Sequence, residues 1–326
     1  MRILYNTYPM AFHTPGGGEI QLRAYRHYLT QRGLQVDLFD LWNPDFLSYD
    51  RVHYFSVVGG SEHFCDFVKK LKVPLFVTSS LWISEETRDL YPWQQIRHQL
   101  CVADRVVTNS NLESQQLSRV FNLPIEKFFV VYNGVDPIFF NSVSSDIFRR
   151  HFNIDYPFVL NVGNIEPRKN QLCLLQALKK HPDLKLVSIG HIRDEAYGKQ
   201  CREVGKNQFV FLGPLDHRDS ILRSAYAACE LFALPSTLET PGLAAIEAAA
   251  QGAKIVVTGV GSAREYFDDL AWYVMNPKEV DEIAEKLAQA LSCKHPGRAL
   301  SQKTKQQFSW DHTLQALVTL YRSPIS

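Results

Sequence analysis

Short hydrophobic runs alternate with helix-like segments from the beginning of the chain. Residues 3–5 are an apolar run that predicts a strand, and a glycine-rich turn follows it. Apolar side chains recur at helical spacing between residues 19 and 31, and Gly33 is suited to end this helix. Residues 36–39 predict the next strand. A strand, a glycine loop, a helix and a second strand make the unit from which parallel sheets are built.

The same alternation continues along the chain and then begins afresh. Small polar residues at 141–145 predict a linker, after which a strand at 158–163 and a helix at 171–180 repeat the opening pattern. Further strands are predicted at 52–58, 75–78, 105–108, 128–132, 184–189, 209–211, 231–234 and 254–258, and further helices at 61–71 and 112–121. We therefore expect an α/β protein with two Rossmann-like domains. Ligands of such sheets bind beyond the carboxyl ends of the strands, so we expect the active site in a central cleft between the halves.

Composition and charge narrow the class of protein. A length of 326 residues suits two domains, and 45% hydrophobic with 21% charged residues is typical of a globular protein rather than a disordered one. Thirty-five basic residues against 34 acidic ones argue against nucleic acid as the main partner. We expect no membrane-spanning segment and no signal peptide. The six cysteines form no C-x-x-C pair, which favours free thiols in a reducing cytoplasm over a metal site.

The most informative segment is residues 234–252, LPSTLETPGLAAIEAAAQG. Thr240 and Pro241 predict the N-cap and the first position of an alanine-rich helix. The amides of Gly242 and Leu243 would then lie at a helix start, where backbone N–H groups bind anions. Because Gly242 has no Cβ, a phosphate could approach it closely.

Two glutamates bracket this predicted phosphate site. Glu247 lies five residues beyond Gly242, about 7.5 Å along a helix axis, which is roughly the distance from a diphosphate to the ribose hydroxyls of a nucleotide. Glu239 precedes the helix, where a transferred sugar would lie. The alternative is a solvated loop acid at position 239 and a partner for a nearby cation at position 247.

A second polar group follows the strand that opens the second half. Gly163 and Asn164 come directly after it, and Arg168 and Lys169 are adjacent a few residues later. Two cations at the carboxyl edge of a sheet could stabilise a leaving diphosphate. A solvated basic turn is the alternative.

These motifs resemble those of the retaining nucleotide-sugar glycosyltransferases of family 4, which have the GT-B fold. The family's hallmark is a pair of glutamates separated by seven residues and preceded by Pro-Ser, and Pro235, Ser236, Glu239 and Glu247 fit it. Residues 16–19, 103–110, 131–136, 162–169, 211–213 and 308–310 match further family stretches, so the resemblance covers nearly the whole chain. It implies an acceptor-binding domain at 1–142 plus 309–326 and a donor-binding domain at 143–308, with a C-terminal helix that crosses back to the first domain.

The resemblance also implies roles for individual residues. Glu239 would contact the donor sugar and Glu247 the ribose hydroxyls, while Arg168 and Lys169 would hold the diphosphate. The implied catalytic residues are Glu239, Lys169 and Arg168, and the implied donor-binding residues are Glu247, Gly242, Leu243, Thr240, Gly163 and Asn164, with Gly17 and Gly18 approaching from the facing domain. The family requires no metal, which agrees with the absence of any Asp-x-Asp triplet, and we expect no cofactor.

Two positions depart from the family pattern. Asn164 stands where relatives often carry Arg, a charge that Arg168 beside Lys169 could supply. Many relatives have a His near position 80 that contacts the donor sugar; here Ser79, Ser80 or Trp82 fills this role, or the sugar is held differently. His53 matches a family position on the preceding strand, although a core or rim histidine is the more ordinary interpretation.

The resemblance predicts transfer of a sugar, with a hexose favoured, from a nucleoside-diphosphate sugar to a hydroxyl of a carbohydrate or lipid-linked acceptor, as in glycan, glycolipid or polysaccharide assembly. A sugar-nucleotide epimerase, a phosphorylase and a non-catalytic nucleotide-sugar-binding protein are the alternatives. Basic residues at 23–32 and 69–72 suit peripheral contact with the anionic inner face of a membrane, but solvated helix faces are the simpler explanation.

Overall fold

The computed structural model describes residues 1–13, 15–294 and 297–325, which divide into two compact units. Unit 1 comprises Met1–Gly134 with Trp310–Ser326, and unit 2 comprises Val135–Ser309. The expected domain boundaries differ from this division at residues 135–142 and at residue 309. Residues 135–142 stay with unit 2 because the Gln251 amide donates to the carbonyl of Phe139, and the Phe139 ring packs 6.1 Å from the ring of Tyr226.

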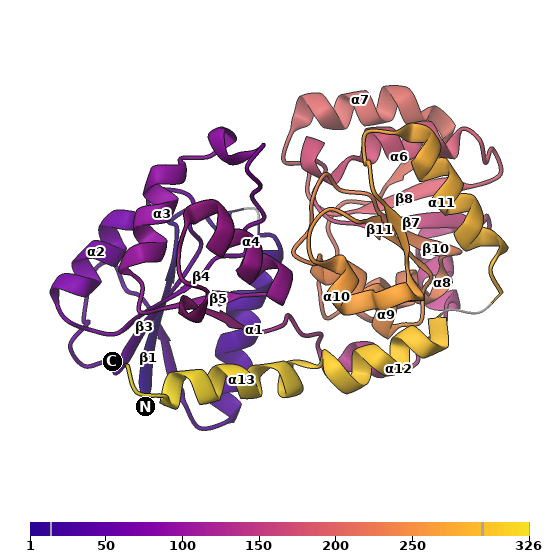
Figure 1. The fold of residues 1–326 in the computed structure, drawn as a ribbon. Helices are drawn as coiled ribbons and strands as arrows, with labels where there is room; N and C mark the ends of the chain where they lie inside the picture. The colour runs from indigo at the N-terminus through magenta and orange to yellow at the C-terminus, as the bar shows by residue number, and fades with distance from the viewer. Residues whose placement is uncertain (14, 295–296, 326) are drawn as a thin grey trace. The chain divides into compact units, whose positions relative to one another are not determined.

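Unit 1 is built on a parallel sheet whose six described strands have the order β2–β1–β3–β4–β5–β6 (Figure 1). The strands are β1 Arg2–Thr7, β2 Gln35–Leu38, β3 Arg51–Phe55, β4 Leu75–Thr78, β5 Arg105–Thr108 and β6 Phe128–Val130. All four residues of β4 are buried, as expected for a central strand with helices on both faces. Such burial explains why these strands are continuous apolar runs in the sequence.

The described helices of unit 1 pack around this sheet. They are α1 Gly17–Gln31, α2 Glu62–Lys70, α3 Trp93–Val102, α4 Asn111–Phe121 and α13 Trp310–Arg322, with short 3-10 turns at Arg88–Leu90 and Ile125–Lys127. The last helix, α13, belongs to unit 1 although it ends the chain, and it packs beside α1 (Figure 1). Its buried residues Trp310, Leu314, Leu317 and Tyr321 recur every three to four positions, so they share one helix face.

Unit 2 repeats the architecture, with six described parallel strands in the order β12–β11–β10–β7–β8–β9. The strands are β7 Phe158–Val162, β8 Lys185–Ile189, β9 Phe209–Phe211, β10 Leu231–Leu234, β11 Ile255–Thr258 and β12 Trp272–Val274. The described helices are α5 Asp146–Phe152, α6 Gln171–Leu178, α7 Glu195–Gly205, α8 Ser220–Ala228, α9 Leu243–Ala250, α10 Ala263–Phe267, α11 Val280–Ser292 and α12 Gly297–Gln307, with 3-10 turns η3 Pro137–Phe140, η4 Pro167–Lys169, η5 Lys206–Gln208 and η6 Asp268–Leu270.

The expected fold class, α/β with two Rossmann-like domains and a C-terminal helix that returns to the first domain, is confirmed by these two sheets and by the placement of α13. In unit 2 the strand order reverses between β7 and β10, because the chain passes from β7 to β8 on one side and later returns to β10 on the other. Such a switch point is where open α/β sheets bind ligands. In the part of the chain that the structure describes, no helix is both long and apolar enough to cross a membrane.

Candidate active site

Charged residues gather in unit 2 where β7 and β10 end. The two strands are neighbours, and the loops that follow them carry Arg168 and Lys169 on one side and Glu239 on the other. The Asn170 side chain donates to the carbonyl of Pro235 over 2.9 Å, and the Thr237 amide donates to the carbonyl of Arg168 over 2.9 Å. These bonds clamp the two loops together at the switch point of the sheet.

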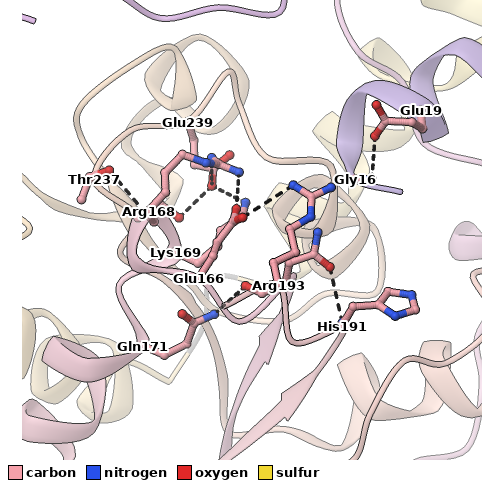
Figure 2. Close-up of polar contacts among 12 residues, drawn as sticks. Gly16, Glu19, Glu166, Arg168, Lys169, Gln171, His191, Arg193, Thr237 and Glu239 are labelled. Atoms are coloured by element: carbon pink, nitrogen blue, oxygen red, sulfur yellow. Dashed lines mark hydrogen bonds and ion pairs between the residues drawn. The ribbon is translucent and has the colours of Figure 1, made fainter. Parts of the chain in front are cut away.

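A buried ion pair lies at the centre of this group. Lys169 Nζ is 2.6 Å from Glu239 Oε1, and Arg168 Nη1 is 3.6 Å from the same oxygen (Figure 2). The Ser236 hydroxyl donates to Glu239 Oε1 over 2.7 Å. The side chains of Glu239 and Lys169 are only 6% and 13% exposed, whereas that of Arg168 is 43% exposed. Glu239 is therefore a buried carboxylate shared by two cations and not a solvated loop acid.

The pKa values of this pair follow from burial and charge. For Glu239 burial is the largest influence and raises the pKa of the carboxyl, but Lys169, Arg168 and the Ser236 hydroxyl together outweigh it, so the pKa lies below its usual value. For Lys169 burial is the largest influence and, together with the charge of Arg168, lowers the pKa of the ammonium against the opposing effect of Glu239. The two shifts have opposite effects on the ion pair, since one favours a carboxylate and the other a neutral amine. The 2.6 Å contact and the second cation favour the ionised pair at neutral pH.

A second carboxylate extends the charge cluster. Glu166 Oε1 accepts from Arg168 over 3.0 Å, and Glu166 Oε2 lies 3.5 Å from a guanidinium nitrogen of Arg193, as Figure 2 shows. The cluster thus alternates in sign from Arg193 through Glu166 and Arg168 to Glu239 and Lys169. Three cations against two anions leave one positive charge, which suits a site for an anionic ligand.

Helix α9 begins later than the sequence predicts. Thr240 and Pro241 are not its N-cap and first residue; the N-cap is Gly242, with φ of +87°, and Leu243 is the first helical residue. The reason is tertiary, because the Glu239 backbone pairs with the loop after β11: its amide donates to Val260 and its carbonyl accepts from Ser262. Residues 240–242 complete the turn away from this loop, and the helix starts after it.

The glycines of the site allow close approach. A Cβ on Gly242 would lie 3.2 Å from Glu239 Oε2, and one on Gly163 would lie 3.5 Å from Lys169 Cε, so both glycines border the ion pair. Among the described residues, the amides of Leu243 and Ala244 have no acceptor, as is usual in a first helical turn. Asn164 is buried and its side-chain oxygen accepts from the His191 amide over 3.4 Å. Gly163, Lys169, Glu239 and the start of α9 are therefore neighbours in space.

Glu247 lies one turn into α9 and is also buried. Its Oε1 is 2.5 Å from His217 Nε2, and its Oε2 accepts from the Tyr226 hydroxyl over 2.9 Å. Proximity of Glu247 is the largest influence on His217 and raises the pKa of the imidazole, against the opposing effect of burial. His217 is thus the partner of Glu247, and Glu239 lies in the loop that leads into the same helix.

Comparisons with known proteins agree with this geometry. A family model described as glycosyl transferases group 1 matches residues 144–307, half of the chain, and includes the whole charge cluster. The chain belongs to the group 1 glycosyl transferases.

The curated relatives of this chain are described as glycosyltransferases. This chain is 30% identical over 236 residues to D-inositol 3-phosphate glycosyltransferase of Mycolicibacterium smegmatis, a match that covers 69% of this chain and 54% of the relative. The chain thus spans about half the length of the curated relatives it matches. It is also 28% identical over 235 residues to an uncharacterised glycosyltransferase of Methanocaldococcus jannaschii, covering 67% and 60% of the two chains.

Solved structures confirm the GT-B fold class of this glycosyl transferase. Sucrose-phosphate synthase from Thermosynechococcus elongatus has a TM-score of 0.80 at 19% identity, covering 98% of both chains. Anabaena HepE in complex with UDP-glucose has a TM-score of 0.77 at 21% identity, covering 98% of this chain and 99% of that one. At these identities the likeness concerns the fold.

The remaining predicted residues of the glycosyl transferase lie in unit 1. Gly17 and Gly18 are the first two residues of α1, which follows the carboxyl end of β1. Ser79 is buried and donates to Glu113, so its hydroxyl serves the fold. Ser80 is exposed, with φ of +43°, and its hydroxyl donates to a side chain on α1. Trp82 is half-buried nearby in sequence. Of these serines, only Ser80 is presented to solvent.

His53 is a core residue and not a ligand of a sugar. It is fully buried, with Nε2 2.7 Å from the Thr78 hydroxyl and Nδ1 in contact with the Tyr321 hydroxyl. The Tyr321 hydroxyl also bonds that of Tyr5 over 2.9 Å. Burial lowers the pKa of His53 to about 3, so the ring is neutral at pH 7. The ring joins the sheet of unit 1 to α13, which leaves it no access to a substrate.

The basic residues expected to suit a membrane surface mostly have partners within unit 1. Lys69 Nζ is 2.6 Å from Asp104, and Arg32 pairs with Asp311 over 3.3 Å. Arg23 lies over the ring of Phe12 at 4.8 Å. These contacts favour the simpler explanation, in which the charges stabilise the surface of the unit.

Sequence reasoning missed four residues that the structure adds to the site. Arg193 lies four residues after the end of β8, which is the neighbour of β7 in the sheet. A cation just beyond the end of such a strand could have been recognised in the sequence. Glu166 lies within the basic turn, but nothing local indicates which cations it binds. His217 and Tyr226 come from a loop and a helix about 20–30 residues before Glu247, so only the fold reveals them. Among the described residues there is no group of three or more His, Cys, Asp or Glu placed to hold a metal ion.

Proposed function

We propose that this protein transfers a sugar from a nucleoside-diphosphate sugar to a hydroxyl of a carbohydrate or lipid-linked acceptor, with retention of the anomeric configuration. One observation carries the proposal: Arg168, Lys169 and Arg193 converge with a helix start at the switch point of the unit 2 sheet. Convergent cations and free amides at such a place suit a diphosphate.

The diphosphate would lie against the first turn of α9. Leu243 and Ala244 offer amides there, and Lys169 is held beside them through Glu239. In sugar transfer the anomeric carbon becomes oxocarbenium-like while the departing diphosphate gains negative charge. Fixed cations and amides lower this barrier, and removal of one such donor typically costs about 3–4 kcal/mol, or roughly 100–1000-fold in rate.

The two glutamates would then have different roles. Glu239, beside Gly242, would accept a hydrogen bond from the transferred sugar, and Glu247 would accept from the ribose. We assign acceptor deprotonation to an oxygen of the departing diphosphate, with attack of the acceptor hydroxyl on the same face of the sugar. All these charges belong to the protein, so we propose that transfer needs no metal.

The named activities of relatives guide the test. The protein would be incubated with UDP-glucose and other nucleoside-diphosphate sugars together with acceptors such as inositol phosphate or a sugar phosphate, and nucleoside diphosphate release would be measured with and without EDTA. We expect acceptor-dependent release that EDTA does not abolish, and NMR of the product would show a retained configuration. Isomerised donor without any acceptor would contradict transfer and indicate an epimerase.

Variants test the site itself. Glu239→Gln and Lys169→Ala should each lower the rate about 100-fold or more. Lys180→Ala, which removes an exposed surface lysine of the same unit, should leave the rate unchanged. Unchanged rates in both site variants would refute the assignment. Sedimentation with anionic vesicles at low and high salt tests the further proposal of peripheral membrane contact.

A further inference from the structure

The Glu247 carboxylate is held by two donors, one at each oxygen. His217, in the loop between β9 and α8, contacts Oε1 at 2.5 Å, and Tyr226 on α8 donates to Oε2 over 2.9 Å. A carboxylate has about four lone-pair sites, so these contacts leave roughly two for another donor. Glu247 is only 5% exposed, and its contacts with these two donors fix the plane of the carboxylate.

The two donors are themselves held in place. The His217 ring packs 5.3 Å from the ring of Phe139 on η3, and the buried Tyr226 ring packs 5.9 Å from that of Phe232 on β10. Asp136 at the start of η3 and Arg218 next to His217 are the other charged groups that face the imidazole, and they lie 3.8 Å from each other. Proximity of Glu247 raises the pKa of His217, which favours a proton on the ring.

Burial of the Glu247 carboxylate costs desolvation free energy that a purely structural role does not require. Glu247 is the only charged residue of α9, whose other residues are leucine, alanine and isoleucine. Replacing a buried ion pair by apolar side chains is often neutral or stabilising, so stability alone does not account for a carboxylate in such a helix. Glu247 also lies only four residues, about 6 Å along the axis, from the amide of Leu243 at the helix start.

We propose that His217 and Tyr226 are positioning residues, which orient the Glu247 carboxylate so that its remaining lone pairs accept hydrogen bonds from the ribose 2′ and 3′ hydroxyls of the donor. The inference rests on the proposed function, which assigns Glu247 to the ribose. It adds that recognition of the ribose requires two residues that need not touch the nucleotide.

The test compares two nucleotides that differ only at the ribose. Affinities of UDP and 2′,3′-dideoxy-UDP would be measured by calorimetry for the wild type and for His217→Ala, Tyr226→Phe and Glu247→Gln. We expect the wild type to prefer UDP by about tenfold or more, the effect of one or two hydrogen bonds to a charged group. Each variant should lose most of this preference while its affinity for the dideoxy nucleotide changes little. Adding Glu247→Gln to His217→Ala should cause little further loss.

Two controls separate positioning from folding. Tyr226→Phe keeps the ring and its packing and removes only the hydroxyl, so it tests the proposal even where His217→Ala weakens the fold. His151→Ala replaces an exposed histidine of the same unit and should leave both affinities unchanged.

The possible results separate a failure of the positioning role from a failure of the proposed function. Equal weakening of both nucleotides in His217→Ala and Tyr226→Phe would indicate a structural role and overturn the inference. An undiminished ribose preference in these two variants, with a lost preference in Glu247→Gln, would overturn the inference alone. A Glu247→Gln variant that keeps the preference would overturn the ribose role of Glu247 together with the inference. A wild type that binds none of UDP, GDP and ADP would overturn the proposed function itself.

Discussion

Replacement of Lys169 by methionine should separate the stability of the site from its activity. Methionine fills similar volume but leaves Glu239 buried with a carboxylate that has lost its closest cation, at 2.6 Å. Removal of one partner of a buried pair costs about 3–5 kcal/mol. Because Arg168 at 3.6 Å and the Ser236 hydroxyl at 2.7 Å remain, we expect the low end, about 3 kcal/mol. For a domain of this size each kcal/mol lowers the melting temperature by about 2–4 °C, so the expected loss is about 6–12 °C.

The double variant Lys169→Met with Glu239→Gln gives the decisive comparison. A neutral glutamine can still bond to Ser236 and needs no counterion, so the double variant should recover most of the stability that Lys169→Met loses. Sugar transfer should stay reduced by about 100-fold or more in the double variant and in both single variants, because each lacks part of the charge arrangement.

Urea unfolding and steady-state rates of the four proteins complete this cycle. If the two single destabilisations are simply additive, the coupling free energy is near zero and the carboxylate and the ammonium do not stabilise each other. This result would refute the interpretation of Lys169 and Glu239 as an ion pair. Recovery of both stability and activity in the double variant would instead show that the pair serves only the fold.

Three further predictions concern the fold around the site. The pKa of His53 is about 3 in the folded protein and about 6.5 in the unfolded chain. The unfolded chain therefore binds the extra proton, and the free energy of unfolding falls as the pH decreases from 6.5 towards 3. Relative to His53→Gln, the wild type should lose about 3 kcal/mol of stability between pH 6.5 and pH 4, measured by urea unfolding. Gly261→Ala should weaken UDP binding and lower stability by more than about 2 kcal/mol, because its Cβ would lie 1.9 Å from the carbonyl oxygen of Glu239. The control is Gly213→Ala: Gly213 also has a positive φ, but a Cβ there would meet nothing within 4 Å, so this variant measures backbone strain alone. Equal effects of the two substitutions in calorimetry and thermal unfolding would contradict the prediction. Gly134→Ala should loosen α13, because its Cβ would lie 2.6 Å from the amide nitrogen of Trp310, and hydrogen exchange of residues 310–322 should rise more than that of unit 2.

Much of the fold could be predicted from the sequence because the central strands are buried on both faces. Buried parallel strands must be apolar throughout, so the runs at residues 75–78 and 231–234 coincide with β4 and β10. The catalytic candidates Glu239 and Lys169 could be predicted for a related reason: each follows a strand end, and the carboxyl ends of neighbouring parallel strands meet at one edge. The resemblance of the glutamate pair to a known family supplied the rest of the assignment.

Other features depended on partners that are distant in sequence, and only the tertiary structure decided them. The local signals at Thr240 and Pro241 predicted a helix start, but pairing of the Glu239 backbone with the loop after β11 moved it to Leu243. Burial of His53 depends on α13, which comes from the other end of the chain. A sequence determines which residues can be buried or charged, because those are properties of single side chains. Which cation meets which carboxylate depends on how strands and helices pack, and that is a property of the whole fold.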